Sequence, residues 1–244
     1  MRFKFRESSG LIKNILPLEI IKEISVQIEN IIDSNKNKLD ISESNYLVRD
    51  NLHRITYISN IAEYININKL NNYFDEINSK IVHKNKNFLL SSSELHVRWP
   101  GCESIPPHQD NFYHCFKDVT SFKILLPLTE FKYPNSFLNY AKVNIDQTTL
   151  RHVASSVPAF SSFIPESIMS SLNLNWINYK FNLGDILWHS ISSIHFADKN
   201  LTNAKSYFLV FRFDEASSII DQKMMNNYKK VFDKHKELIK KKFN

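Results

Sequence analysis

The sequence predicts a mainly β protein, a jelly roll with helices flanking it. Apolar residues recur at helical spacing near both ends of the 244-residue chain, whereas the middle is a run of short segments with the two-residue period of strands. These strands do not alternate strictly with helices, as they would in a parallel sheet. The length suits a single domain, because all-β barrels of this size commonly form one unit.

The first predicted helix runs from Pro17 to Ile32, where apolar residues recur every three or four positions after a proline suited to a first helical turn. A second candidate helix spans Ile61 to Val82. Its pattern is less regular, because asparagines between positions 66 and 72 weaken a helix.

The strand-rich middle begins at Phe88. Leu95, Val97 and Trp99 alternate there with polar residues, which is the period of a half-buried strand. Polar or proline-containing segments such as 132–135 and 158–166 separate the later candidates. Those candidates are Phe122–Leu128, Ala141–Val143, Trp176–Phe181, Asp185–His189 and Ser206–Phe213.

Helical spacing returns after Asp214, with Ile220, Met224, Tyr228 and later apolar residues on one side. We therefore expect one domain over residues 1–244. Its parts would be helical padding over 1–87, a jelly-roll core over 88–213 and a C-terminal helix over 214–244.

Glycine and cysteine are scarce, with three and two residues. Gly10, Gly101 and Gly184 lie too far apart for a phosphate-binding loop or a dinucleotide fingerprint. Cys102 and Cys115 cannot build a disulfide framework or a four-cysteine zinc site. We see no signal peptide or spanning helix, and so expect a cytoplasmic protein that does not bind a membrane.

The basic charge balance favours an anionic partner or substrate, because the formal charge is +6 and the isoelectric point is near 9.1. Much of the excess comes from lysines between positions 229 and 242, and charge runs of this kind usually form a solvated helix face. No RNP or helix-turn-helix pattern accompanies them, so we expect no nucleic-acid partner.

The candidate metal ligands are His108, Asp110 and one of two downstream histidines, His189 or His195. Side chains two residues apart on a strand point the same way, so His108 and Asp110 could share a metal. Two histidines and one carboxylate leave positions open on an iron(II) ion. Those positions would accept a bidentate oxoacid and dioxygen.

The segment from Ile105 to Tyr113, IPPHQDNFY, resembles the proline-rich HQD-plus-aromatic signature of phytanoyl-CoA dioxygenase-like proteins. These are Fe(II)- and 2-oxoglutarate-dependent oxygenases. In that family a Gly-Asp pair precedes the distal histidine by eleven residues, and an Asn and a Ser or Thr follow it by five and seven. The resemblance covers roughly residues 95 to 213. The matching downstream residues are Gly184, Asp185, His195, Asn200 and Thr202.

This resemblance implies a cupin-like double-stranded β-helix, and it selects His195 over His189 as the third ligand. It also implies that His108, Asp110 and His195 hold Fe(II), with 2-oxoglutarate as a co-substrate that chelates the metal. Dioxygen would convert the co-substrate to succinate and carbon dioxide while a substrate C–H bond is attacked. Asn200 and Thr202 would belong to the co-substrate region.

The chain departs from the family at Ser206, where the family has an arginine that pairs with the far carboxylate of 2-oxoglutarate. Our preferred replacement is Lys123, because a charged side chain in an apolar run needs a partner and because Jumonji-type hydroxylases place their co-substrate lysine at similar spacing. Lys205 is the second candidate, but it faces inward only if a bulge shifts the strand. Arg212 has the right parity and lies farther along.

For several other polar and aromatic residues the sequence allows two positions. His96 and Arg98 face either solvent or the barrel lumen, and Arg98 is a further candidate for contact with an anionic ligand. His114 either lines the pocket or is an incidental loop residue. Tyr113 and Trp188 are expected in the core or the pocket wall, since aromatic residues mostly fill space.

The predicted function is an Fe(II)- and 2-oxoglutarate-dependent oxygenase, a hydroxylase of a small or carrier-linked organic substrate. One alternative is a cupin-like metalloenzyme that uses the same triad without 2-oxoglutarate, which the missing arginine permits. The other is a non-catalytic binding barrel.

Overall fold

The computed structural model describes residues 7–35, 45–47, 55–82, 87–118, 120–130, 138–142, 148–157 and 160–243. Its helices are α1 (Leu18–Asn35), η1 (Ile61–Glu63, a 3-10 helix), α2 (Asn68–Ile81), α3 (Asn111–His114), α4 (Glu166–Met169) and α5 (Gln222–Phe243). Its strands are β1 (Ser9–Ile12), β2 (Asn45–Leu47), β3 (Ile55–Ser59), β4 (Phe88–Arg98), β5 (Ile105–His108), β6 (Phe122–Pro127), β7 (Leu138–Lys142), β8 (Val153–Val157), β9 (Phe160–Phe163), β10 (Asn175–Asn178), β11 (Ile186–Ser190), β12 (His195–Ala197) and β13 (Ser206–Glu215).

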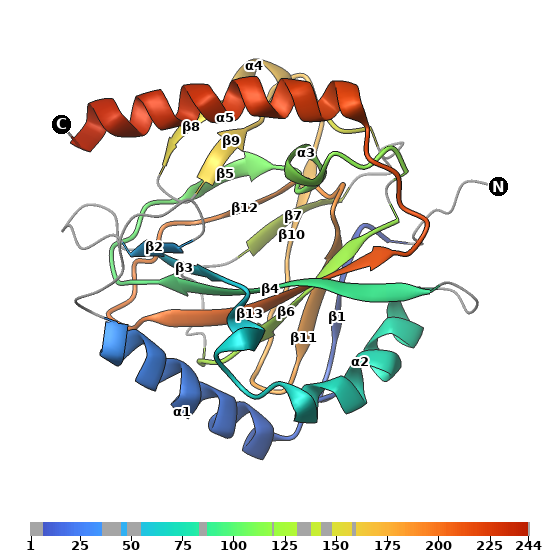
Figure 1. Ribbon diagram of the computed structural model, residues 1–244, viewed down its shortest axis with the longest axis vertical. Coiled ribbons are helices and arrows are strands. Elements are labelled where there is room, and N and C mark those ends of the chain that lie inside the picture. The colour runs from blue at the N-terminus through green and yellow to red at the C-terminus, as the bar shows by residue number, and fades with distance from the viewer. Residues whose placement is uncertain are drawn as a thin grey trace.

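Two antiparallel sheets form the body of the protein, as Figure 1 shows. The larger has the order β1-β11-β6-β13-β4-β3-β2, and the smaller has the order β10-β7-β12-β5. From β4 to β13 the chain passes back and forth between them, with β4, β6, β11 and β13 in the larger sheet and β5, β7, β10 and β12 in the smaller. This alternation is the jelly roll that the sequence predicts.

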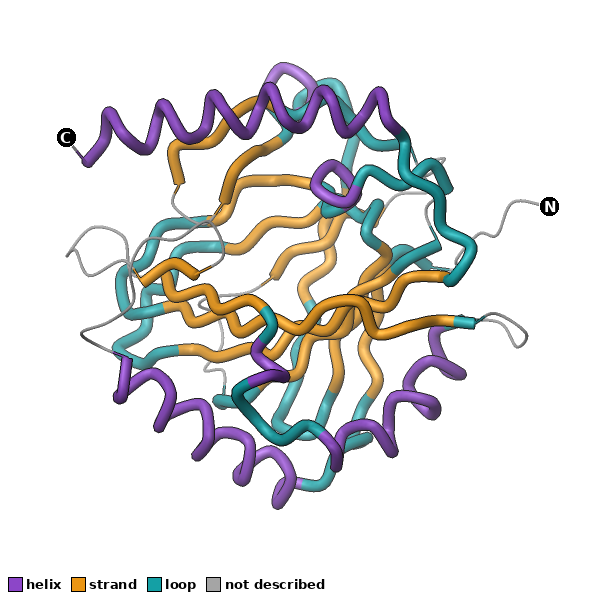
Figure 2. Tube along the Cα trace, viewed as in Figure 1, coloured by secondary structure: helices purple, strands orange, loops and turns teal. Residues whose placement is uncertain are grey.

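Helices α1 and α2 cover the outer face of the larger sheet, and α5 crosses the opposite side of the molecule (Figure 2). The apolar face of α1 buries Ile21, Ile24, Ile28 and Ile32 in the main core, which confirms the first predicted helix. None of the described helices combines the length and apolarity needed to cross a membrane.

The second predicted helix is interrupted. Instead of one helix over 61–82, the structure has η1, a break, and then α2. Within the break the Asn66 side chain accepts a hydrogen bond from the backbone N–H of Asn68 (3.0 Å). An asparagine that bonds to its own backbone in this way competes with helix formation.

The segment before residue 88 is not only helical, which corrects our expectation for 1–87. It contributes β1 at one edge of the larger sheet and β2 and β3 at the other. These strands have three to five residues, so their alternation is too short to separate from background.

Several bounds in the strand-rich middle also differ from the prediction. The segment 158–166, expected as a connection, contains β9, which pairs with β8. β7 begins at Leu138, three residues before the predicted start, and β10 ends at Asn178 rather than at Phe181. The predicted connection 132–135 and Val143 lie outside the described residues.

The metal-motif strands β5 and β12 were missed for physical reasons. β5 contains Pro106 and Pro107, which cannot donate to a sheet ladder, and it lies at the edge of its sheet, where proline is tolerated. β12 has three residues. Neither carries a readable strand pattern.

The net charge of the chain is located on α5. This helix has eight lysines and two acidic residues, which accounts for the whole formal charge of +6. All eight lysines are exposed. The basic run is therefore a solvated helix face, and the rest of the chain is neutral overall.

Two glycines form turns in the chain ahead of the metal ligands: Gly101 (φ +78°) precedes β5, and Gly184 (φ +95°) precedes β11, the strand before β12. Only glycine adopts this region without strain. A Cβ on Gly184 would also lie 2.9 Å from the Leu16 carbonyl oxygen, whereas a Cβ on Gly101 meets nothing within 4 Å.

Gly184→Ala is expected to lower the free energy of unfolding by about 2–3 kcal/mol, through both backbone strain and the clash with Leu16. Gly101→Ala, with strain alone, should cost about 1 kcal/mol. Urea denaturation of the two variants checks the difference. Equal losses would contradict the role of the Leu16 contact.

Candidate metal centre

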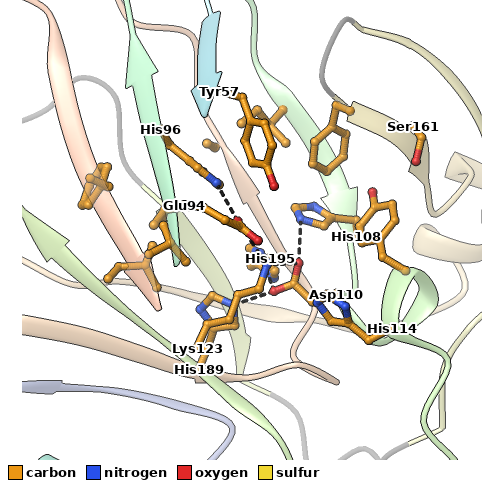
Figure 3. A pocket seen from close by; sticks show the side chains of 18 of the residues that line it. Tyr57, Glu94, His96, His108, Asp110, His114, Lys123, Ser161, His189 and His195 are labelled. Carbon is orange, nitrogen blue, oxygen red and sulfur yellow. Dashed lines mark hydrogen bonds and ion pairs between the residues drawn. The ribbon is translucent and has the colours of Figure 1, made fainter. Parts of the chain in front are cut away.

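Three potential metal ligands converge between the two sheets. His108 ends β5, Asp110 lies just before α3, and His195 begins β12, where it pairs in register with His108. One ligand atom from each lies within 4.8 Å of the others, and all three residues are buried. The Nε2 atoms of His108 and His195 lie 3.9 and 4.0 Å from the Asp110 carboxylate (Figure 3).

The backbone fixes which nitrogen of each histidine faces this centre. His108 Nδ1 lies 3.0 Å from the Pro106 carbonyl oxygen, and His195 Nδ1 lies 3.0 Å from the Ser193 carbonyl oxygen. A carbonyl accepts only from a protonated Nδ1, so Nε2 carries the lone pair. This is the outer-shell arrangement that orients histidines for a metal.

Burial keeps both histidines neutral. It lowers the pKa of His108 well below its ordinary value, and it lowers that of His195 to about 3, with the neighbouring His189 adding to the effect. A neutral imidazole is the form that binds a metal.

Asp110 is ionised although it is buried. Burial opposes ionisation, but Lys123 and the hydrogen bond from His189 hold the pKa of this carboxyl well below its usual range. Lys123 Nζ donates to Asp110 Oδ1 (3.2 Å), and His189 Nε2 donates to Oδ2 (2.9 Å). His189 also lies 3.3 Å from the Tyr140 hydroxyl through Nδ1. His189 therefore orients the carboxylate, and His195 completes the triad.

A second buried carboxylate, Glu94, lies beyond Lys123. His96 Nε2 donates to it (2.9 Å), Tyr57 forms a hydrogen bond with it, and Lys123 Nζ is 3.9 Å away. Burial alone would raise the pKa of Glu94, but Lys123 and His96 outweigh it and lower the pKa to about 2. Both carboxylates in turn raise the pKa of Lys123 against the effect of burial.

The loop that carries Asp110 is held by side chains that sequence reasoning did not single out. Gln109 donates through its amide to the Thr148 and Ser192 carbonyls, and its backbone N–H donates to His152 Nε2 (3.0 Å). Asn111 likewise bonds to Phe116 and Thr149. In sequence, only the adjacency of Gln109 and Asn111 to the motif could have indicated this.

A cavity of about 280 Å³ opens beside the triad, and its wall includes His96, Arg98 and His114. His96 and Arg98 therefore face the lumen and not solvent, and His114 is a pocket residue and not an incidental loop residue. Tyr113 also lines the cavity, whereas Trp188 packs in the main core. Sequence reasoning did not identify the remaining lining residues as part of a site; they include Tyr57, Glu94, Phe160, Tyr228 and Phe232.

Lys205 lies outside the cavity, which corrects its prediction as a co-substrate ligand. Its Nζ is 3.4 Å from Glu29 of α1 and 4.8 Å from the centre of the Trp99 ring. No bulge turns it inward; the irregularity between β13 and β4 falls at Arg212 and Phe213.

Asn200 and Thr202 hold a turn, not the cavity. The buried Asn200 amide donates to the carbonyls of Arg98 (3.0 Å) and Ala204 (2.9 Å), and its Oδ1 accepts from the Thr202 hydroxyl (2.7 Å). Neither residue lines the cavity, so the structure does not bring them to the place where we expect the co-substrate.

Two arginines occupy different settings. Arg212 donates to His114 Nδ1 (2.6 Å) and pairs with Asp214 (3.0 Å). Arg98 is buried and donates through Nη2 to the Glu103 carbonyl (2.8 Å). Its Nε and Nη1 have no nitrogen or oxygen partner among the described residues, and the Cys102 thiol lies beside the guanidinium. Arg98 pairs in register with Ser206, whose buried hydroxyl is also unpartnered within the described part of the chain.

Comparisons with solved structures find the same fold in several enzymes. The carbocyclase SnoK, a non-heme α-ketoglutarate-dependent enzyme of nogalamycin biosynthesis, aligns with a TM-score of 0.67 and 12% identity over 88% of this chain and 82% of its own. The epimerase SnoN, in complex with Fe3+, α-ketoglutarate and nogalamycin RO, has a TM-score of 0.66 and 11% identity over 88% and 82%. EvdO2 from Micromonospora carbonacea var. aurantiaca, complexed with 2-oxoglutarate, has values of 0.63 and 14% over 88% and 89%.

These likenesses establish the fold, a cupin-like jelly roll. No family model matches the sequence, and no curated protein matches it. The resemblance to phytanoyl-CoA dioxygenase-like proteins therefore stays a prediction.

Buried neutral histidines should make the metal-free protein acid-sensitive. Burial lowers the pKa of His114 and His195 to about 3 and that of His152 to about 4, whereas an unfolded histidine titrates near 6.5. Between these values the unfolded chain binds more protons, so stability falls as the pH falls. Each histidine should cost roughly 2 kcal/mol between pH 7 and pH 5, as measured by urea denaturation.

His114→Gln provides the matched control, because a glutamine carbonyl can still accept from Arg212 but does not titrate. This variant should lose roughly 2 kcal/mol less than the parent protein over the same pH range. The same loss in both proteins would contradict the assignment.

Proposed function

We propose that this protein is an Fe(II)- and 2-oxoglutarate-dependent oxygenase that hydroxylates a small organic substrate. The observation that carries the proposal is the triad itself, in which two neutral imidazoles present Nε2 and one ionised carboxylate faces them from within a buried cavity. This donor set suits non-heme iron(II). The fold supports the proposal, since SnoN and EvdO2 share it.

The residues around the triad fit a metal that keeps open positions. His189 is the fourth nearby group, but its Nε2 is engaged by Asp110 and its Nδ1 by Tyr140, so it would not occupy a coordination position. When bound, iron would supply the oxidation of the substrate at the expense of dioxygen and 2-oxoglutarate. The chain's own part is to hold the ligands, keep Asp110 ionised and exclude water.

The far carboxylate of 2-oxoglutarate needs a cation, and two line the cavity. Lys123, the sequence prediction, is already shared between Asp110 and Glu94. Two nitrogens of the Arg98 guanidinium, Nε and Nη1, have no nitrogen or oxygen partner among the described residues, and Arg98 stands beside Ser206, the position where the resembled family has its arginine. Directly opposed residues in an antiparallel pair project from the same face of the sheet. We therefore propose Arg98 as the anchor of the far carboxylate, so that the cation comes from β4 and not from the neighbouring strand β13.

Anaerobic addition of Fe(II) and 2-oxoglutarate tests the function. A visible metal-to-ligand charge-transfer band is expected, and His108→Ala should abolish it because one of three ligands is lost. Iron binding without the band would favour the cupin-like alternative. No iron binding would favour the non-catalytic barrel.

The anchor is tested by titrating 2-oxoglutarate into the iron-loaded protein and following the same band. Arg98→Gln should weaken binding by roughly 10- to 100-fold, the value of one charge-assisted hydrogen bond or pair. Lys123→Met removes the cation that keeps Asp110 and Glu94 ionised, so the two variants are compared at a saturating Fe(II) concentration; there Lys123→Met should change the dissociation constant of 2-oxoglutarate less than Arg98→Gln does. The reverse order of effects would identify Lys123 as the anchor.

A further inference from the structure

The cavity has two chemically different halves. Toward the larger sheet its wall carries the charged groups, which are Glu94, Arg98, Asp110 and Lys123. Toward α5 its wall is made of four aromatic side chains, which we call the aromatic compartment: Tyr113, Phe160, Tyr228 and Phe232.

The rings of the compartment touch one another and reach the triad. Phe160 meets the His108 ring edge-on, with centroids 4.3 Å apart, and it is 6.0 Å from Tyr113. Tyr228 lies 5.9 Å from Tyr113 and 5.8 Å from Phe232. A molecule held among these rings would therefore lie directly against a proposed metal ligand.

Two polar groups in this half already have backbone partners. The Tyr113 hydroxyl, which burial keeps protonated by raising its pKa, donates to the Ser162 carbonyl (2.8 Å). His235, also in the wall, lies 2.6 Å from the Ser155 carbonyl through Nδ1. Beside these rings the described lining has no lysine, arginine, aspartate or glutamate, so a charged ligand group here would lose its water without gaining a counter-charge, which is costly.

Size limits the ligand as well. The whole cavity of about 280 Å³ lies near the lower end of the range for small-molecule sites, roughly 300–1,000 Å³, and under the proposed function 2-oxoglutarate takes part of it. The compartment has room for one compact ring system. Aromatic walls favour flat rings, which they contact face to face or edge to face.

We propose that the aromatic compartment binds an uncharged, flat and apolar ring system and that this ring is the part of the substrate presented to the metal. Only the statement that this ring belongs to a substrate rests on the proposed function. The binding of the ring itself depends on the four aromatic side chains.

Fluorescence titration with 2-naphthol tests the proposal. Two comparison compounds are titrated as well: 2-naphthoate, which is charged, by fluorescence, and glucose, which is a polyol, by calorimetry. The protein is kept anaerobic with Fe(II) and 2-oxoglutarate, and each titration is repeated without them. We expect 2-naphthol to bind at least roughly tenfold more tightly than either comparison compound. Failure of 2-naphthol to bind, or equal affinity for the three, would overturn the proposal.

Substitutions locate the binding. Phe160→Ala and Phe232→Ala should each weaken 2-naphthol binding roughly tenfold, whereas Phe232→Tyr keeps a ring and should bind normally. Tyr64→Ala removes an exposed ring that does not line the cavity and serves as the control. Thermal unfolding of each variant verifies that it is folded. Unchanged binding in both alanine variants contradicts the proposed location.

The two proposals can fail separately. Binding that depends on Phe160 and Phe232 without a charge-transfer band would retain the ring site and refute the oxygenase. A charge-transfer band together with 2-naphthol binding that does not depend on Phe160 and Phe232 would support the oxygenase and refute the ring site.

Discussion

The structure depends on one electrostatic requirement, that the Asp110 carboxylate be buried and ionised. An isolated charge in such a place would be protonated, so cationic and hydrogen-bonding partners must surround it. Lys123 and His189 supply them, and these two residues face each other in register on β6 and β11. Strand pairing in the larger sheet thus prepares the position to which the loop after β5 delivers Asp110.

The same requirement divides the interior. Lys123 is shared by two carboxylates, and the histidines around them stay neutral because burial penalises a further charge. Charge is thereby concentrated against the larger sheet, and the side toward α5 is left to aromatic rings. The excess positive charge of the chain lies outside, on the exposed face of α5. Net charge therefore describes the surface of this protein and not its cavity.

Sequence periodicity identified the elements that are long enough to show it. Helix α1, helix α5 and strand β4 have 18, 22 and 11 residues, and each was predicted near its observed place. The elements that were missed are short or contain proline, as β5 and β12 show. Their pairing is decided by neighbouring strands, which a local pattern does not contain.

The sequence by itself determined the jelly-roll class from its strand pattern, and it determined the three residues that converge through a family resemblance, which selected His195 over His189. Only the tertiary structure decided which cations reach the cavity. Lys205 and Arg98 lie at the ends of neighbouring strands, yet one packs outside on Trp99 and the other lines the lumen. The physical reason is that the face of a strand on which a side chain emerges alternates with every residue, so strand register, set by pairing partners distant in sequence, fixes its direction.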